Sequence, residues 1–195
     1  MRILFVCTGN TCRSPMAEGM LRKLARERGL SVEVRSAGVA ATEGSSMSYH
    51  AEAVLKDQGI KDSITSTLLG AELTDWADLI LTLTESHKRQ VLFTFPQAAE
   101  KVYALKEFVE DNETVLADQE ELQQLIADVE LERALGKPQN EAKIRRINEI
   151  ARRLPVYDIS DPFGGSRDVY DRTAAEIRVA LSKLLDKLDQ WGKIS

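Results

Sequence analysis

The chain has few cysteines, few histidines and no excess of basic residues, and each shortage excludes a class of protein. Only two cysteines occur among 195 residues, both in the first twelve positions, so a disulfide framework is excluded. Lysine and arginine number 26 against 31 aspartate and glutamate residues, a net charge of −5 that argues against a nucleic-acid-binding surface. The two histidines, His50 and His87, have no partners at metal-ligand spacing and are expected at the surface or at a helix start.

Long hydrophobic runs are also missing. No apolar run reaches the length needed to cross a membrane, and no signal peptide precedes the first apolar segment. The sequence therefore predicts a cytoplasmic protein with no membrane partner. Its 43% hydrophobic and 29% charged residues are typical of a globular domain with its own core.

The first fourteen residues are the most informative segment. The apolar residues 3–6 end at Cys7, and Arg13 follows just before Ser14-Pro15. The apolar run is typical of a buried parallel strand, and Ser14-Pro15 of a helix N-terminus with Ser14 as its cap. Residues 8–13 are thus predicted to form a tight loop between a strand and a helix, with a thiol before it and a guanidinium at its end.

A loop that curls over a helix N-terminus can hold a phosphate dianion with its backbone N–H groups. These N–H dipoles and Arg13 favour the thiolate of Cys7, which could attack phosphorus. Arg13 also offers a planar fork for two phosphoryl oxygens, and Ser14 can donate a hydrogen bond to the thiolate. The expected phosphate-binding residues of this phosphate loop are Thr8, Gly9, Asn10, Thr11, Cys12, Arg13 and Ser14. An inert buried thiol is the alternative, but it leaves the arginine and the helix start at this spacing unexplained.

The spacing of Cys7, Arg13 and Ser14 resembles the N-terminal signature of the low-molecular-weight protein tyrosine phosphatase family. That family has a general-acid aspartate in an Asp-Pro pair near the C-terminus, and this chain has Asp161-Pro162. The resemblance implies that Cys7 is the nucleophile and that Asp161 protonates the leaving group, then activates water against a phosphocysteine. It implies a monomer that needs no metal or cofactor, because the loop supplies the positive field.

Periodicity predicts the order of strands and helices. Strands are expected at residues 3–6, 32–38, 78–83 and 102–105, and helices after Ser14, at 49–58, at 86–93 and along 177–188. This alternation predicts an α/β fold in three layers: a four-stranded parallel sheet flanked by helices, with the phosphate loop after the first strand. By resemblance, Ser36 supports the phosphate loop through Asn10. Many relatives carry a further supporting histidine, but this chain has only Ile-Thr-Ser-Thr at residues 64–67.

Two positions indicate the substrate. Thr11 stands where tyrosine phosphatases of the family usually have Ile or Leu, and Phe163 stands where Trp or Tyr is frequent; with these residues the chain is most similar to bacterial protein-arginine phosphatases. A hydroxyl at Thr11 can accept from the N–H groups of a phosphoguanidinium, which an aliphatic chain cannot. The resemblance implies that the partners are proteins that a bacterial protein-arginine kinase phosphorylates on arginine in stress regulation.

The sequence is also compatible with other activities. A tyrosine phosphatase of the same family is the first alternative. Arsenate reduction would need further cysteines, which the chain lacks after Cys12. A phosphoprotein-binding or thiol-redox module without turnover is disfavoured by the intact Asp161. Cys12 itself could form a reversible disulfide with Cys7 by resemblance, or could be a small buried residue.

Residues 111–157 are the main departure from the family, most of whose members lack such a segment. Apolar residues at helical spacing predict one helix that ends near Gly136 and a second one capped by Asn140. The first is acidic and the second basic, so they are expected to pair antiparallel. We expect residues 1–195 to form one phosphatase domain, with this helical insertion before Asp161 either shaping access for a protein substrate or serving as a passive elaboration.

Overall fold

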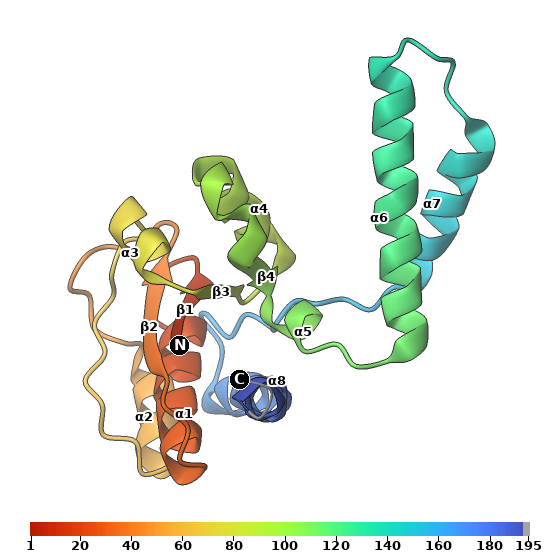
Figure 1. The fold of residues 1–195 in the computed structure, drawn as a ribbon. Coiled ribbons are helices and arrows are strands. Elements are labelled where there is room, and N and C mark those ends of the chain that lie inside the picture. Colours follow the sequence, from red (N-terminus) through yellow and green to blue (C-terminus); the bar gives the residue numbers. More distant parts are fainter. Residues whose placement is uncertain (193–195) are drawn as a thin grey trace. The chain divides into compact units, whose positions relative to one another are not determined.

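The structure, a computed structural model, describes residues 1–192 of the chain. The chain divides into two compact units, of which the first contains Met1–Val109 and the residues from Tyr157 onward, and the second contains Glu110–Val156. The elements of the first unit are β1 (Arg2–Cys7), α1 (Arg13–Glu27), β2 (Glu33–Gly38), α2 (Tyr49–Asp57), α3 (Ala71–Trp76), β3 (Leu79–Thr82), α4 (Glu85–Thr94), the 3-10 helix η1 (Pro96–Lys101), β4 (Val102–Ala104), α5 (Leu105–Phe108) and α8 (Arg167–Gly192) (Figure 1).

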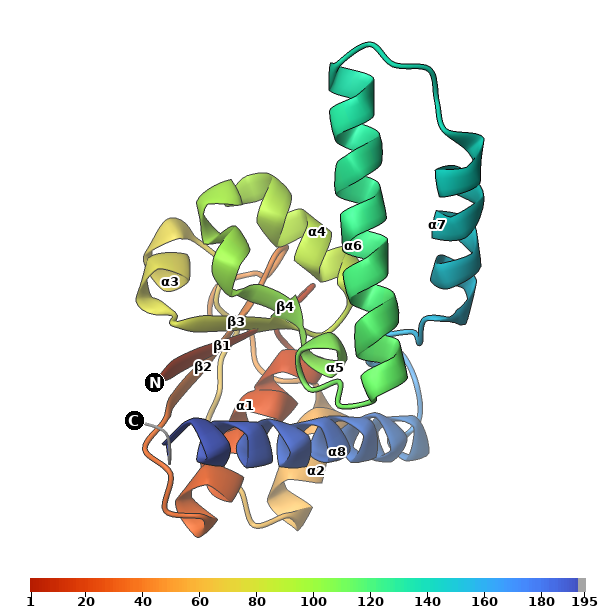
Figure 2. The same cartoon turned by 45° about the vertical axis from the view of Figure 1, so that its right-hand side comes forward.

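The four strands form one sheet in the order β2-β1-β3-β4, and every pair is parallel. Helices α1, α2 and α8 lie against one face of the sheet, and α3 and α4 against the other (Figure 2). The predicted three-layer α/β fold is therefore confirmed. The strand β1 lies inside the sheet, and its last residue, Cys7, is paired with Gly38 at the end of β2.

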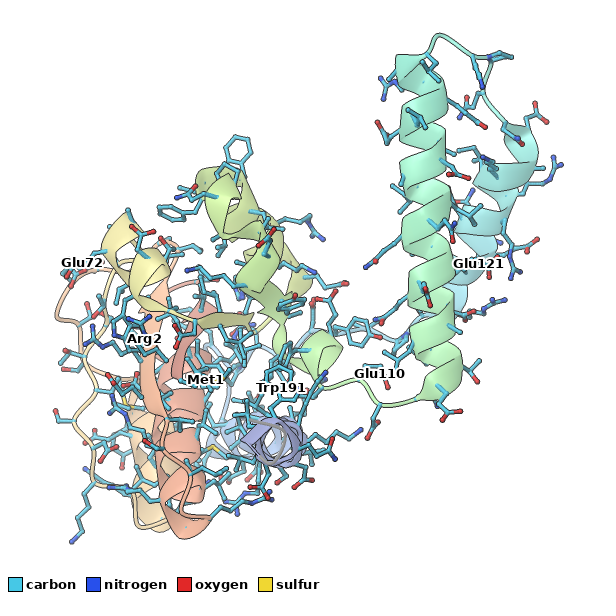
Figure 3. All side chains as sticks on the ribbon, viewed as in Figure 1. Met1, Arg2, Glu72, Glu110, Glu121 and Trp191 are labelled. Atoms are coloured by element: carbon cyan, nitrogen blue, oxygen red, sulfur yellow. The ribbon has the colours of Figure 1, made fainter. Side chains whose placement is uncertain are left out.

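The core is divided by β1, whose side chains alternate between the two faces. Ile3 and Phe5 pack into the cluster formed with α1 and α8, whereas Leu4 and Val6 pack into the cluster formed with α3 and α4. All four side chains have no exposed surface, as expected for a strand covered on both faces. This burial fixes the carboxyl end of β1, from which the phosphate loop starts. At the far end of α8, where Figure 3 labels Trp191, the ring of Trp191 lies perpendicular to that of Phe108.

Most element boundaries fall within two residues of the prediction, but the expected cap of α1 is wrong. The helix begins at Arg13, its N-cap is Cys12, and no side chain caps it. Ser14 lies inside the first turn, and its hydroxyl bonds the thiol of Cys7 instead of capping the helix backbone. Helix α2 ends at Asp57, one residue before the predicted end, and Gly59 follows the C-cap Gln58 with a φ of 73°, a conformation that glycine adopts without strain.

The second unit is a helical hairpin of α6 (Glu113–Ala134) and α7 (Glu141–Arg153) (Figure 1). The side chains of Asn112 and Asn140 accept hydrogen bonds from the first turns of the two helices, which stabilises each N-terminus. The acidic helix α6 faces the basic helix α7. The ion pairs between them are Asp118–Arg153, Glu121–Arg146, Asp128–Lys143 and Glu132–Lys143. Glu121 is labelled on α6 in Figure 3. The predicted charge pairing between the two helices is present.

Candidate active site

The phosphate loop connects β1 to α1 in a tight curl. Asn10 has a φ of 54° and is the one non-glycine residue with a positive φ in the described part of the chain; asparagine tolerates this region better than most residues. Three carbonyls of the curl accept hydrogen bonds from surrounding backbone: Cys7 from Val39 (3.0 Å), Thr8 from Ala40 (2.9 Å) and Thr11 from Ser48 (2.9 Å). In a trans peptide the N–H points away from the carbonyl, so the amides that follow these carbonyls face the inside of the curl.

Asn10 is the centre of a buried hydrogen-bond network. Its Oδ1 accepts from the backbone N–H of Thr67 at 2.8 Å, and its Nδ2 donates to Ser14 Oγ and Ser36 Oγ, both at 2.8 Å. Ser36 in turn donates to Glu18, whose pKa is raised by burial. The expected contact between Ser36 and Asn10 is thus present. The backbone of Thr67 supports the loop from the segment where a supporting histidine is missing.

The thiol of Cys7 lies at the base of the loop with 3% of the residue exposed. Its Sγ is 2.9 Å from Ser14 Oγ, and the backbone N–H of Asn10 donates to it at 3.3 Å. Ser14 Oγ already accepts from Asn10 Nδ2, so its one hydroxyl proton can go to the sulfur at 2.9 Å or to the carbonyl of Ala37 at 3.5 Å, and the sulfur is the nearer acceptor. Both donors favour a negatively charged sulfur.

Arg13 and Asp161 lie together although they are far apart in the sequence. Arg13 Nη2 is 3.1 Å from Asp161 Oδ2, and Arg13 Nη1 donates to the carbonyl of Ile159 at 3.4 Å. The arginine is buried, whereas 56% of the aspartate side chain is exposed. A hydrogen bond from the backbone of Ile159 to the carbonyl of Leu83 holds the segment before Asp161 at the end of β3. The fold thus brings the predicted acid to the predicted phosphate clamp.

Gly38 is a functional position that sequence reasoning missed. A Cβ on this residue would lie 2.4 Å from the carbonyl oxygen of Thr8 and 2.9 Å from the backbone nitrogen of Asn10. Real Cβ atoms do not approach backbone so closely, so only glycine lets the end of β2 contact the phosphate loop. A glycine at the end of a predicted strand carried no signal of this contact, because the approach depends on the register between β1 and β2.

His87 corrects the expectation of a surface histidine. It is the third residue of α4, as expected for a helix start, but only 4% of it is exposed. Its Nε2 lies 2.8 Å from Thr8 Oγ1 in the phosphate loop. Burial and the charge of Arg13 lower its pKa to about 4, so the imidazole is neutral at pH 7. His50 is half-buried, and its ring contacts Tyr49 and Tyr170.

The predicted substrate-selecting residues differ in exposure. Thr11 is half-buried, and Phe163 is 79% exposed two positions after Asp161. Cys12 is buried, with its Sγ 3.3 Å from the hydroxyl of Tyr170 and 3.4 Å from Ser48 Oγ. Cys7 and Cys12 are both free thiols in this structure.

Within residues 1–192, no group of three or more His, Cys, Asp or Glu side chains is arranged to hold a metal ion. None of the helices in that range combines the length and the apolar character that a membrane span requires.

The chain is similar to known proteins in both sequence and fold. The family model described as low molecular weight phosphotyrosine protein phosphatase matches residues 2–122. A protein-arginine-phosphatase of Geobacillus stearothermophilus is 36% identical over 187 residues, which cover 96% of this chain and 95% of the relative. A protein-arginine-phosphatase of Bacillus subtilis is 34% identical over 188 residues, 96% of this chain and 97% of the relative. A solved structure of the arginine phosphatase YwlE, a C7S mutant with a phosphorylated active-site serine, has a TM-score of 0.72 and 33% identity, and covers 97% of this chain and 96% of that one.

Proposed function

The chain belongs to the low molecular weight phosphotyrosine protein phosphatase family and is a cysteine-based phosphatase, and from this premise we propose that it hydrolyses phosphoarginine in proteins. The observation that carries the proposal is its similarity, along nearly the whole chain, to two protein-arginine-phosphatases. Thr11 in the phosphate loop supplies a physical reason for the preference. Its hydroxyl can accept from the N–H groups beside the phosphorus, and leaving such groups unpaired costs about 1–3 kcal/mol.

In the first proposed step, the thiolate of Cys7 attacks the phosphorus in line with the leaving nitrogen. An S–P bond forms and the P–N bond breaks, and Asp161 gives its proton to the departing guanidine nitrogen. The inward-facing N–H groups of the phosphate loop and the fork of Arg13 hold the three phosphoryl oxygens as their charge shifts.

In the second step, water attacks the phosphocysteine. Asp161, now a carboxylate, takes a proton from the water while a P–O bond forms and the S–P bond breaks. The sulfur leaves as a thiolate, and the hydrogen bonds from Ser14 and from the backbone of Asn10 stabilise its charge. Inorganic phosphate is released, and the Cys7 thiolate is ready for another turnover.

The pairing of Arg13 with Asp161 fits this sequence. A bound phosphoryl dianion offers Arg13 a better partner than a single, largely exposed carboxylate. When the guanidinium turns to the phosphoryl oxygens, Asp161 is released, takes up a proton from the solvent and gives that proton to the leaving group. Phe163, exposed beside this acid, offers a flat ring face to the planar guanidine.

A tyrosine phosphatase is the second candidate, and the description of the family itself favours it. The substitution Thr11→Ile separates the two. If the protein is an arginine phosphatase, this change lowers kcat/KM for a phosphoarginine peptide and raises it for a phosphotyrosine peptide. If both values stay within about twofold, a difference below about 0.4 kcal/mol, Thr11 does not select the substrate.

The Cys7→Ser variant tests whether turnover depends on the thiol. The variant should release no phosphate but still bind a phosphoarginine protein, because the loop and Arg13 are retained. Unchanged behaviour after the loss of Cys7 would instead indicate a binding module.

Three further properties belong to the proposal. The partners are arginine-phosphorylated proteins of a stress response, and the active form is a monomer. We place the activity in the cytoplasm, because the reaction needs Cys7 as a reduced thiol.

Under oxidants, we propose that Cys12 forms a reversible disulfide with Cys7. Peroxide treatment followed by mass spectrometry of the intact protein would detect this disulfide as the loss of two hydrogens. Retention of two free thiols would leave Cys12 as a small buried residue packed against Tyr170.

A further inference from the structure

His87 and Thr8 form a contact that the proposed reaction does not use. Thr8 directly follows the nucleophile and is exposed at the phosphate loop, whereas His87 is buried in the first turn of α4. The backbone N–H of His87 donates to the N-cap Thr84 at 3.1 Å, which fixes the start of the side chain. Its Nε2 reaches Thr8 Oγ1 at 2.8 Å. The helix thus presents one ring nitrogen to one hydroxyl of the loop.

The surroundings keep this imidazole neutral. The charged groups that face it are Arg13, Asp158 and Asp161, and the effect of burial and of the cationic Arg13 exceeds that of the two carboxylates. A neutral imidazole carries one proton, on either Nδ1 or Nε2. His87 therefore contributes a hydrogen bond to the loop rather than a positive charge, and does not exchange protons with the substrate near pH 7.

The surroundings of Nδ1 indicate which ring nitrogen of His87 carries the proton. Nδ1 is buried and has no hydrogen-bond partner among the described residues. A buried N–H without an acceptor is rarer in proteins than a buried acceptor without a donor. The proton is thus assigned to Nε2, which donates to Thr8 Oγ1. Because the oxygen of Thr8 already accepts this bond, its own hydroxyl proton points away from His87.

We propose that His87 is a positioning residue and that the Thr8 hydroxyl it orients is a further hydrogen-bond donor to the phosphoryl group. The phosphate loop then offers a side-chain donor next to Cys7 in addition to its backbone N–H groups. This inference rests on the proposed function only in requiring that a phosphoryl group binds in the loop. It is independent of which phosphorylated amino acid is the substrate.

Two matched pairs of variants test the proposal. Thr8→Val removes the hydroxyl at nearly constant shape, whereas Thr8→Ser keeps it. His87→Leu removes the ring nitrogens, whereas His87→Gln places an amide N–H near the position of Nε2. Turnover of para-nitrophenyl phosphate and inhibition by orthovanadate are measured for each variant and for the double variant Thr8→Val/His87→Leu. Both probes occupy the phosphate loop whichever protein substrate is native. A negative result for Thr8 and His87 can therefore be told apart from an error in the proposed substrate class.

We expect Thr8→Val and His87→Leu each to lower kcat/KM and to weaken orthovanadate binding by about tenfold, the effect of one good hydrogen bond to a charged group. The double variant should lose no more than either single variant, because both act through one bond. Thr8→Ser and His87→Gln should stay within about threefold of the parent, a difference below 0.7 kcal/mol.

Losses that multiply to about a hundredfold in the double variant would overturn the proposal. So would a Thr8→Val variant that turns over and binds orthovanadate like the parent, or a folded His87→Gln variant as impaired as His87→Leu. If His87→Leu does not fold, Thr8→Val against Thr8→Ser, together with His87→Gln, still decides the question. Wild-type protein without turnover of any phosphorylated substrate would contradict the proposed function instead.

Discussion

Arg13 Nη2 lies 3.1 Å from Asp161 Oδ2, so the proposed phosphate clamp and the proposed acid contact each other directly. The contact joins the N-terminus of α1 to the loop that precedes α8. Both groups belong to the first unit, together with Cys7 and His87. The chemistry proposed for this protein therefore depends on one compact part of the chain.

Replacing Asp161 with asparagine should remove the acid and base without removing the phosphate site. We expect kcat to fall by about 10²–10⁴-fold, the usual contribution of a general acid–base group, while orthovanadate still binds. Asp158→Asn is the matched control, since this nearby carboxylate accepts a hydrogen bond from the backbone of Glu85 and an amide oxygen can replace it. Steady-state kinetics with phosphoarginine peptide compares the two. Equal losses in both variants would exclude a special role for Asp161.

A methyl group on Gly38 should displace the phosphate loop. Gly38→Ala places a Cβ 2.4 Å from the Thr8 carbonyl oxygen, and the resulting shift should lower the free energy of unfolding by about 1–3 kcal/mol and activity by about 10²-fold. Gly70→Ala is the control, because a Cβ there meets no atom within 4 Å. Urea unfolding and turnover are measured for both. Parent-like turnover in Gly38→Ala would show that the loop tolerates the shift.

Asn10 should be important for both conformation and hydrogen bonding. Asn10→Ala loses the bonds to Thr67, Ser14 and Ser36 and strains a φ of 54°, so we expect about 2–4 kcal/mol of destabilisation. Asn10→Gly relieves the strain but not the lost bonds. It should therefore be more stable than Asn10→Ala and less stable than the parent in thermal or urea unfolding. If Asn10→Gly matches the parent, the network contributes no net stability.

The buried His87 should make the fold less stable in mild acid. Its pKa is about 4 in the folded protein and about 6.5 in an unfolded chain, so the unfolded state binds more protons between these values. The contribution of neutral His87 to the free energy of unfolding is fully present above about pH 6.5 and is lost as the pH falls toward 4. Between pH 7 and 5 the parent should lose about 2 kcal/mol more than His87→Gln in urea unfolding. An equal loss in both proteins would contradict the low pKa.

Removing the helical hairpin should leave the chemistry intact. Replacing residues 112–156 with a short flexible linker keeps every proposed catalytic residue, so turnover of para-nitrophenyl phosphate should remain within about threefold, less than 0.7 kcal/mol. If the hairpin shapes access for proteins, kcat/KM for an arginine-phosphorylated protein should fall at least tenfold. Equal loss on both substrates would contradict that role, and no loss on either would favour a passive elaboration.

Local signals explain what the sequence could predict. The apolar run before Cys7 and the spacing to Arg13 identify the strand, the loop and the helix, and the caps Asn112 and Asn140 are readable because helix capping involves neighbouring residues. The prediction of Ser14 as a cap is wrong, and the competing partner of its hydroxyl, the thiol of Cys7, is seven residues away.

The remaining features depend on packing between distant segments. His87 is buried because α4 packs against the phosphate loop, and nothing near it in sequence indicates Thr8. Only glycine fits at position 38, because the register of β2 against β1 pairs this residue with Cys7 at the start of the phosphate loop. The backbone N–H of Thr67 bonds Asn10, and a backbone donor leaves no trace in the residue type. Each of these contacts supports the phosphate loop from a segment that is distant in sequence, so no local pattern indicates it.

The most direct measurement is kcat/KM of the unmodified protein for phosphoarginine and phosphotyrosine peptides of the same sequence, side by side. We predict a preference of about a hundredfold or more for phosphoarginine, which corresponds to about 2.7 kcal/mol of transition-state discrimination. A preference for phosphotyrosine would contradict the proposed substrate and leave Cys7, Arg13 and Asp161 in their proposed roles.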